Sequence, residues 1–207
     1  MRISYYISKI LKKIHIPAIK NSNIHHTSKV GSFSHMLNVK MNKYSYVANY
    51  CTLVDTDIGC FCSIADNVII GGGAHPIDWV STSPVFHDGK NFMKKNFSKH
   101  SYIPTEQTII KNDVWIGSNC LIKSGVTIEN GAIIGMGSVV TKNVGSYEIW
   151  AGNPAKIIRK RFDDTTIKNL LSIKWWNWNS GKLENNAQFM NNIPEFIKLH
   201  KSKKMRE

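Results

Sequence analysis

Residues 108–140 read TIIKNDVWIGSNCLIKSGVTIENGAIIGMGSVV, and within this stretch an aliphatic residue returns at every sixth position. These residues, called anchors below, are Ile110, Ile116, Ile122, Ile128, Ile134 and Val140. A period of six is neither the helical period of about 3.6 nor the period of about 2 of a half-buried strand. The stretch is therefore an internal structural repeat.

The positions around each anchor suit a stacked coil. Two places before each anchor stands a small or β-branched residue: Thr108, Val114, Cys120, Val126, Ala132 and Ser138. Gly and Asn recur between them, as in Gly117-Ser118-Asn119, and these residues readily adopt the positive φ of tight corners. A short strand and a turn every six residues predict a triangular parallel β-helix with aliphatic columns inside.

This hexapeptide pattern resembles that of the left-handed β-helix acyltransferases. The left hand is an exception to the usual right-handed crossover, so it is implied by the resemblance and not by the period. We therefore expect an all-β fold, a left-handed parallel β-helix with a long catalytic loop insertion and with N- and C-terminal helices.

Three segments are predicted: a basic amphipathic helix over 1–23, the β-helix domain over 24–160 with a loop excursion over 74–107, and a helical extension over 161–207. Ile58, Ile64 and Ile70 continue the anchors backwards, whereas Met41, Val47 and Leu53 form an earlier set that is shifted by one residue. A slipped phase marks a bulge or loop, so an irregular first coil is expected near Asp55.

The N-terminal segment has two interpretations. Its aliphatic residues have helical spacing, Lys residues accompany them, and Pro17 should end the helix. It could pack as a cap, or residues 1–19 could make a peripheral contact with an anionic membrane surface. No apolar run approaches the roughly 20 residues of a membrane span, and no signal cleavage site is visible, so a soluble or peripheral protein is expected.

We expect the catalytic residues to lie around His75. This residue follows Gly71-Gly72-Gly73 and opens an aromatic-rich excursion between two hexad runs. Histidine can act as a base near neutral pH with little tuning. The segment from Gly73 to Pro84 is similar to the catalytic loop of the xenobiotic acetyltransferase branch, which implies that His75 is the general base.

Other residues of the excursion have less certain roles. His87 and His100 are competing candidates for the base. Asp78 could orient His75 or hold the acceptor, and Trp79 could wall the acceptor pocket.

The resemblance also implies a site for acetyl-CoA. Val114-Trp115-Ile116-Gly117-Ser118 matches the family motif beside the pantetheine arm. The residues that the resemblance places at the cofactor are Trp115, Ser118, Gly135, Met136, Thr141, Lys142, Lys156 and Arg159. For the charged residues of this set, Lys142, Lys156 and Arg159, the alternative is that they form a solvent-exposed charged surface and do not bind the cofactor.

The charge and the cysteine content of the chain limit the classes of partner that it is expected to bind. The net charge of +13 favours an anionic partner, such as a CoA ester, an acidic glycan, lipid or nucleic acid. No Arg stripe or recognised nucleic-acid-binding fold is present, so no nucleic acid is expected. Cys51, Cys60, Cys62 and Cys120 lack zinc-like spacing and suit a reducing cytoplasm, Cys62 and Cys120 as core thiols, and no metal is expected.

The favoured function is O-acetylation of a sugar hydroxyl, in a capsule or O-antigen polysaccharide or its precursor, by direct transfer from acetyl-CoA. Acetylation of chloramphenicol or a streptogramin is the alternative, followed by amine acceptors such as nucleotide-linked amino sugars. A non-catalytic scaffold is a further possibility. The resemblance implies a homotrimer whose sites lie between subunits.

Overall fold

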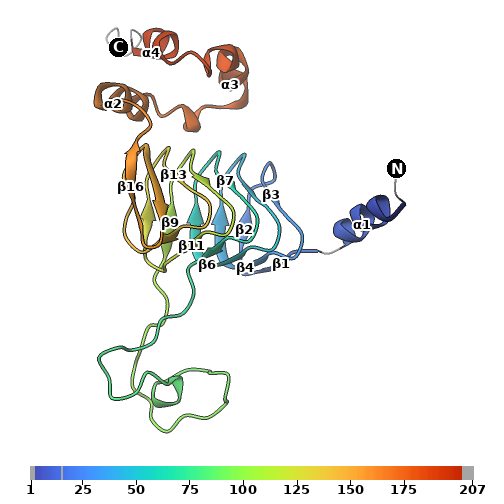
Figure 1. The fold of residues 1–207 in the computed structure, drawn as a ribbon, viewed down its shortest axis with the longest axis vertical. Coiled ribbons are helices and arrows are strands. Elements are labelled where there is room, and N and C mark those ends of the chain that lie inside the picture. Colours follow the sequence, from blue (N-terminus) through green and yellow to red (C-terminus); the bar gives the residue numbers. More distant parts are fainter. Residues whose placement is uncertain (1–2, 15, 202–207) are drawn as a thin grey trace.

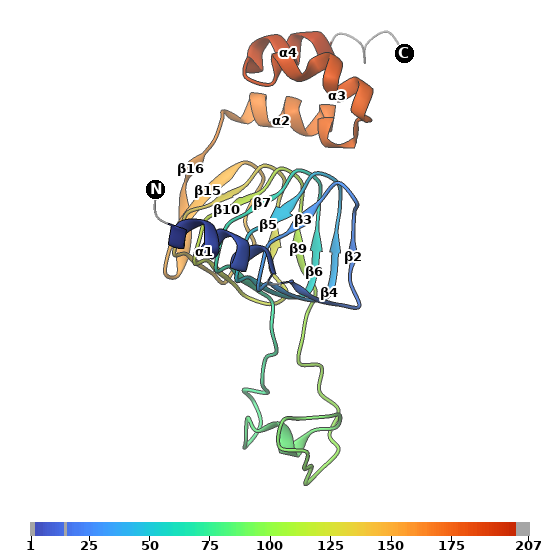
Figure 2. The ribbon, with the colours of Figure 1, turned by 90° about the vertical axis from the view of Figure 1, so that its right-hand side faces the viewer.

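The computed structural model describes residues 3–14 and 16–201 (Figure 1). Residues 1–2 and 15 of the predicted N-terminal segment, and the tail from residue 202, lie outside these ranges. Helix α1 (Ile3–Ile14) precedes a coil of short strands between Ala18 and Lys160. An excursion leaves the coil on one side, and the C-terminal helices lie on the opposite side (Figures 1 and 2).

The coil is a parallel β-helix of triangular section, as predicted. Face 1 contains β1 (Ala18–Lys20), the first halves of β4 (His35–Met41) and β6 (Thr52–Ile58), β8 (Ile69–Ile70), β11 (Leu121–Ile122) and β14 (Val139–Val140). Face 2 contains β2 (Asn23–Ile24), the second halves of β4 and β6, β9 (Thr108–Ile110) and β12 (Thr127–Ile128). Face 3 contains β3 (Lys29–Val30), β5 (Tyr46–Val47), β7 (Ser63–Ile64), β10 (Trp115–Ile116), β13 (Ile133–Ile134), β15 (Glu148–Gly152) and the antiparallel β16 (Ala155–Lys160).

The predicted anchors form the core. All six, and all six residues two places before them, are at most 4 % exposed. Cys51, Cys62 and Cys120 occupy the same kind of inward position, so Cys62 and Cys120 are core thiols, as predicted. Burial of these columns drives the stacking of one coil on the next.

The phase shift at Asp55 is real, but the first coils are not irregular. Thr52 pairs with Ile69 and His35 with Thr52, a repeat of 17 residues, whereas Leu121 pairs with Val139, a repeat of 18. The 17-residue coils have one residue fewer than the 18-residue coils at the corner between faces 1 and 2. Asn21, Asn38 and Asp55 each turn this corner with positive φ, so the same five-residue side recurs in successive coils.

The predicted boundaries differ slightly from the observed elements. The coil begins at Ala18, six residues before the predicted start, because Ala18–Lys20 already pairs with β4.

Helix α1 lies beyond the N-terminal end of the coil in Figure 1, with Ile3, Ile7 and Ile10 at least half exposed. None of the helices in residues 3–14 and 16–201 has the length and apolar character needed to cross a bilayer.

The excursion leaves at the corner between faces 1 and 2. Gly71 has a φ of 76°, and a Cβ atom there would lie 2.2 Å from the Val54 carbonyl oxygen, so only glycine fits. The two arms of its neck meet where the Ala74 N–H donates to the Pro104 carbonyl at 2.6 Å. The chain returns through Glu106, which exchanges two hydrogen bonds with the Ser124 hydroxyl on the next coil.

The C-terminal extension is helical, as predicted. Helix α2 (Asp164–Ile173) is capped by Asp163, whose carboxylate accepts from the Thr166 N–H. Next come a 3-10 turn η2 (Trp175–Asn177), α3 (Ser180–Asn186), a second 3-10 turn η3 (Ala187–Phe189) and α4 (Ile193–Lys201). They form a second apolar cluster together with Tyr147, the last corner residue of the coil.

Candidate active site

His75 lies in the neck of the excursion, next to the Ala74–Pro104 hydrogen bond. Its side chain is exposed, and its Nδ1 atom lies 2.8 Å from the backbone carbonyl oxygen of Thr82. Because a carbonyl only accepts, Nδ1 carries a proton, so in the neutral ring the lone pair is on Nε2. The ring is thus held in the tautomer that a general base needs.

The partner of His75 was missed by sequence reasoning. Asp78 was a candidate for orienting the ring, but the Thr82 carbonyl occupies Nδ1. Every residue has a backbone carbonyl, so no sequence signal could have singled out Thr82.

Asp78 and Trp79 lie together in the excursion. They line a cavity of about 670 Å³ with Val80, Ser81, Phe86, Ser98 and His100. The indole of Trp79 packs edge-on against His100 and Tyr102, at centroid distances of 5.7 and 5.8 Å. These contacts leave a cavity with an aromatic wall, a carboxylate and two hydroxyl groups.

The competing histidines differ in their surroundings. His87 is 8 % exposed and its Nδ1 donates to the Asp88 carbonyl at 2.8 Å, so it belongs to the small core of the excursion. His100 pairs with it through a β-bridge but remains exposed in the cavity with Trp79. His87 is therefore poorly placed to reach a substrate, whereas His100 could contact one.

Several predicted cofactor residues share face 3. Trp115 pairs with Ile133, Ile133 with Ile149, and Ile149 with Arg159, so these four residues form one lateral row, called the outer row of face 3. Trp115 is 54 % exposed, and Arg159 is exposed at the C-terminal end of the row. Lys156 stands on the same final strand, opposite Ala151.

The turns that end face 3 bring the next group together. The Gly137 N–H donates to the Ser118 carbonyl at 2.8 Å, which stacks the turn containing Ser118 on the turn containing Gly135 and Met136. Met136 is 78 % exposed. The outer row and these turns combine apolar surface with cations at one end, which fits a pantetheine arm followed by phosphates.

Thr141 and Lys142 lie elsewhere. They follow Val140 on face 1, at the corner where the excursion leaves two coils earlier, and both are exposed. This corner lies opposite face 3 in the triangular section. One chain therefore keeps His75, Thr141 and Lys142 on one side of the prism and the outer row of face 3 on the other.

The cysteines offer no nucleophile. Burial raises the pKa of the Cys62 thiol to about 12, and burial also raises the pKa values of Cys51, Cys60 and Cys120. A thiol with a raised pKa holds little of the reactive thiolate near neutral pH. Within residues 3–14 and 16–201, no three His, Cys, Asp or Glu side chains gather in a way that could hold a metal ion.

The chain is similar to known proteins in sequence and in fold. Residues 107–142 match the family model described as bacterial transferase hexapeptide (six repeats). A chloramphenicol acetyltransferase from Agrobacterium fabrum is 40% identical over 166 residues, which cover 71% of this chain and 79% of that protein. A probable macrolide acetyltransferase from Lysinibacillus sphaericus is 41% identical over 135 residues, which cover 64% of this chain and 75% of that protein.

A solved structure supports the fold. A mutant of AntD, an N-acyltransferase from Bacillus cereus, in complex with dTDP-4-amino-4,6-dideoxyglucose and coenzyme A, has a TM-score of 0.52 and 21% identity. The match covers 81% of this chain and 96% of that chain. At this identity the likeness shows the left-handed β-helix alone. From its sequence relatives, the chain belongs to the hexapeptide-repeat acetyltransferases, in the branch that contains the chloramphenicol acetyltransferases, and is an acyltransferase.

Proposed function

We propose that this enzyme transfers an acetyl group from acetyl-CoA to a sugar hydroxyl, in a bacterial surface polysaccharide or its precursor. The observation that carries the proposal is the His75 ring, with Nδ1–H held by the Thr82 carbonyl and Nε2 free to accept a proton. His75 removes the proton of the acceptor hydroxyl while its oxygen attacks the acetyl carbonyl, and a backbone N–H stabilises the oxyanion. The imidazolium then returns the proton to the departing CoA sulfur.

The cavity beside Trp79 favours a sugar as the acceptor. An aromatic wall stacks on the apolar face of a sugar ring, and the Asp78 carboxylate and the Ser81 and Ser98 hydroxyls offer hydrogen bonds to its hydroxyl groups. AntD has the same fold and binds a sugar nucleotide together with coenzyme A. Acetylation of chloramphenicol or a related antibiotic is the second candidate, because the relatives at about 40% identity are named for such acceptors.

A homotrimer explains how the two halves of the site meet. His75 and the outer row of face 3 lie on opposite sides of one prism, so a neighbouring copy must bring its excursion to this row. In this assembly Trp115, Ser118, Gly135 and Met136 flank the pantetheine arm, while Lys156 and Arg159 face the phosphates. Thr141 and Lys142 line the groove from the partner's side.

Helix α1 provides a peripheral membrane contact in this proposal. Its apolar residues Ile3, Ile7, Ile10 and Leu11 are 51–77 % exposed, and its sequence contains no acidic residue. An amphipathic basic helix of this kind binds anionic lipid with its apolar face in the interface. The enzyme would then act in the cytoplasm, at the inner membrane face where lipid-linked glycans are assembled.

Replacing His75 by Ala should lower turnover by about 10² to 10⁴, because the acceptor loses its general base. The measurement is release of the CoA thiol in the presence of an acceptor, with the KM for acetyl-CoA within about twofold of wild type. His35→Ala, an exposed histidine of the coil outside the proposed site, is the matched control and should keep the wild-type rate. An unchanged rate in His75→Ala would remove the proposed role.

Mixed oligomers test the shared site. His75→Ala and Trp115→Asp should each be nearly inactive, the second because it replaces the indole beside the pantetheine arm by a carboxylate that the bound arm would desolvate. Random mixing of the two chains should restore about a quarter of the wild-type sites, since a site between subunits takes one intact half from each. If both halves came from one chain, mixing would restore no activity.

The acceptor is tested by acetyl transfer to a panel of sugars, lipid-linked glycans and chloramphenicol, with His75→Ala as the blank. Turnover is expected on a sugar hydroxyl, and expression in a sensitive host should not confer chloramphenicol resistance. Transfer to the antibiotic alone would reject the sugar and favour the second candidate.

The membrane contact is tested by sedimentation with vesicles. Wild-type enzyme should pellet with phosphatidylglycerol vesicles, less with phosphatidylcholine vesicles, and less at high salt. Ile7→Ser combined with Ile10→Ser should stay in the supernatant and keep full activity on a soluble acceptor, because α1 is remote from the catalytic groups. Wild-type protein that stays in the supernatant with both lipids would contradict the proposal.

A further inference from the structure

The outer row of face 3 continues beyond the residues that we assign to the donor. Trp115 pairs with Ser63, and Ser63 pairs with Tyr46. Tyr46 in turn pairs with Lys29, so the row reaches the first coil without a break. Tyr46 is 46 % exposed, Lys29 is exposed and Ser63 is partly exposed. Paired strands lie about 4.8 Å apart, so Tyr46 and Lys29 stand about 5 and 10 Å from Ser63 along the prism.

The level of the excursion along the prism divides this row between the two substrates. The excursion leaves after β8 and returns at β9, and therefore lies in the coil that links Ser63 of β7 to Trp115 of β10. In a trimer of side-by-side prisms with parallel axes, rotation from one copy to the next leaves this level unchanged. The His75 of a neighbouring copy then meets the row between Ser63 and Trp115. The donor extends from there toward the C-terminal end of the row, so the acceptor extends toward the N-terminal end.

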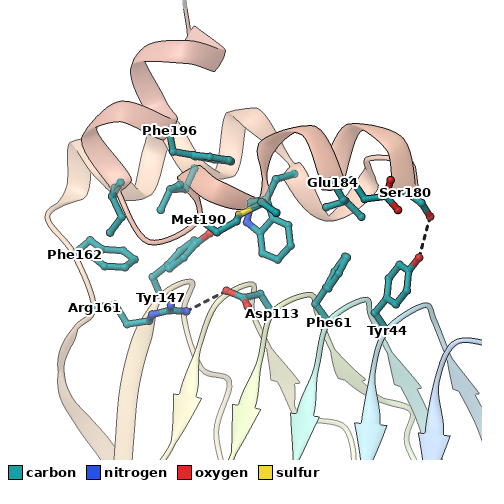
Figure 3. A pocket seen from close by; sticks show the side chains of 15 residues that line it. Tyr44, Phe61, Asp113, Tyr147, Arg161, Phe162, Ser180, Glu184, Met190 and Phe196 are labelled. Atoms are coloured by element: carbon teal, nitrogen blue, oxygen red, sulfur yellow. Dashed lines mark hydrogen bonds and ion pairs between the residues drawn. The ribbon is translucent and has the colours of Figure 1, made fainter.

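The C-terminal helices rise beside this row. They lie over the corner between faces 2 and 3, where Tyr44, Phe61 and Asp113 each precede a member of the row by two positions (Figure 3). The Tyr44 hydroxyl lies 2.9 Å from the Ser180 hydroxyl, so the helices reach the coil that carries Tyr46. A mostly apolar cavity of about 610 Å³ separates the helices from the corner elsewhere, and its lining contains no residue of the row.

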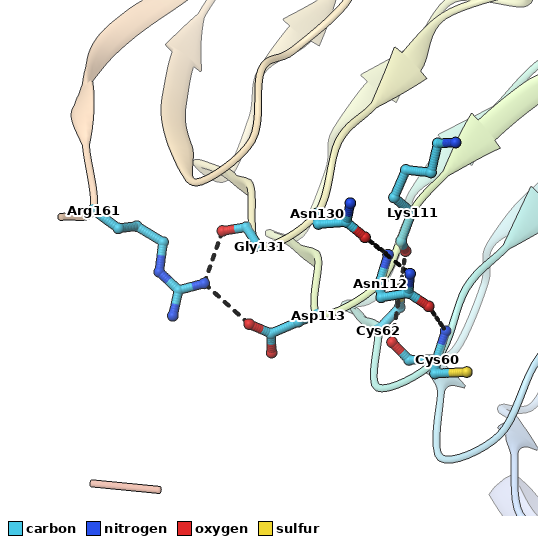
Figure 4. A network of polar contacts seen from close by, with 8 residues as sticks. All are labelled: Cys60, Cys62, Lys111, Asn112, Asp113, Asn130, Gly131 and Arg161. Atoms are coloured by element: carbon cyan, nitrogen blue, oxygen red, sulfur yellow. Dashed lines mark hydrogen bonds and ion pairs between the residues drawn. The ribbon is translucent and has the colours of Figure 1, made fainter. Parts of the chain in front are cut away.

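The start of the helical extension is fixed at the same corner. The Arg161 guanidinium donates to Asp113 at 3.2 Å and to the Gly131 carbonyl at 2.7 Å (Figure 4). Asp113 and Gly131 precede Trp115 and Ile133 by two positions, so this contact holds the extension beside the donor half of the row. Because the helices border both halves, a ligand on the row runs along the prism axis.

The N-terminal half of the row lies in a basic part of the chain. The first acidic residue of the sequence is Asp55, so the residues before it include lysines and no carboxylate side chain. Lys29 takes part in no salt bridge among the residues that the structure describes. Such a region attracts an anion. The CoA phosphates do not account for it, because Lys156 and Arg159 stand at the opposite end of the row.

The three side chains of this half suit a sugar chain that carries a carboxylate. The Tyr46 ring offers an apolar face for stacking on a sugar ring and a hydroxyl for a hydrogen bond. Ser63 adds a second hydroxyl, and the Lys29 ammonium pairs with a carboxylate. A bilayer would instead require apolar side chains that enter its acyl region, and Ser63, Tyr46 and Lys29 provide none.

We propose that the row from Ser63 to Lys29 is a subsite for an acidic glycan chain. The sugar that receives the acetyl group lies at Ser63, against the Trp79 cavity of the neighbouring copy. The next sugar stacks on Tyr46, and its carboxylate pairs with Lys29. This inference rests on the proposed sugar O-acetylation, and it names the acceptor as an acidic oligosaccharide. Tyr46 and Lys29 bind and orient the acceptor and take no part in proton transfer.

The test uses a panel of uronate-containing disaccharides, each paired with its uronamide counterpart, which has the same hydroxyl groups and no charge. Acetyl transfer is measured as release of the CoA thiol. For a pair that is turned over, the wild type should have about tenfold higher kcat/KM on the acidic member, the effect of one charge-assisted hydrogen bond. Lys29→Gln should reduce this preference to within about twofold and keep the wild-type rate on the uronamide.

The matched control is Lys40→Gln. Lys40 is an exposed lysine of the same coils but lies on face 2, paired with Asn23 and Asp57, so its replacement should leave the acidic preference unchanged. Both variants should keep the KM for acetyl-CoA, because the donor occupies the other half of the row.

A second pair of variants tests the stacking surface. Tyr46→Ala should lower kcat/KM about tenfold on the disaccharides and leave a monosaccharide acceptor unaffected, because only the longer acceptor reaches Tyr46. Tyr46→Phe keeps the ring and should retain most of the wild-type rate. An equal loss on both lengths of acceptor would contradict the subsite.

The outcomes separate this subsite from the function on which it rests. Equal turnover of the acidic and uronamide members by the wild type would overturn the subsite and leave sugar O-acetylation in place. Turnover of no sugar would overturn both. If Lys29→Gln lost binding to phosphatidylglycerol vesicles and kept the acidic preference, Lys29 would belong to a membrane contact and the subsite would be rejected.

Discussion

The inward columns of aliphatic side chains are the constraint on which the rest of the structure depends. A single coil has no second layer against which to bury its apolar residues, so each coil uses the coil above and the coil below. Ile116, for example, pairs with Ile64 on one side and Ile134 on the other, and all three are fully buried. The parallel hydrogen bonds between coils follow from the same stacking, because they keep every anchor in register with the next.

This interior leaves no room for chemistry, so function is confined to the outside of the prism. Small polar residues inside the coil are already used: the Ser45 hydroxyl donates to the Gly59 carbonyl and accepts from the Cys62 N–H. A long excursion can leave only at a corner, since an insertion within a strand would break the columns. Gly71 permits that exit, and the Ala74–Pro104 hydrogen bond then closes the neck and positions His75.

Buried hydroxyl groups are hydrogen-bonded differently inside the coil and at its junction with the C-terminal helices. Ser28, Ser34 and Ser45 in the coil each donate to a carbonyl of the next turn. The buried hydroxyl of Tyr147, where the helices meet the coil, has no hydrogen bond of normal geometry to the described residues. The helices are anchored to the coil by individual contacts such as Tyr44 with Ser180, and not by a continuous ladder. Such an attachment leaves a space at the junction, while the repeat itself leaves none.

The sequence alone determined the repeat, the inward residues and the position of the excursion, because a period of six in side-chain size directly reflects which residues face the core. His75 was identifiable because its loop is similar to a known catalytic loop. In the sequence, the 17-residue coils appeared only as a one-residue shift of the anchors near Asp55. The structure shows that successive early coils are each one residue shorter at the same corner. Only the tertiary structure placed the Thr82 carbonyl on His75 and separated His75 from Trp115 across the prism. It also opened the cavity above Tyr147. These features arise from backbone atoms and from contacts between distant segments, which no local pattern of residues records.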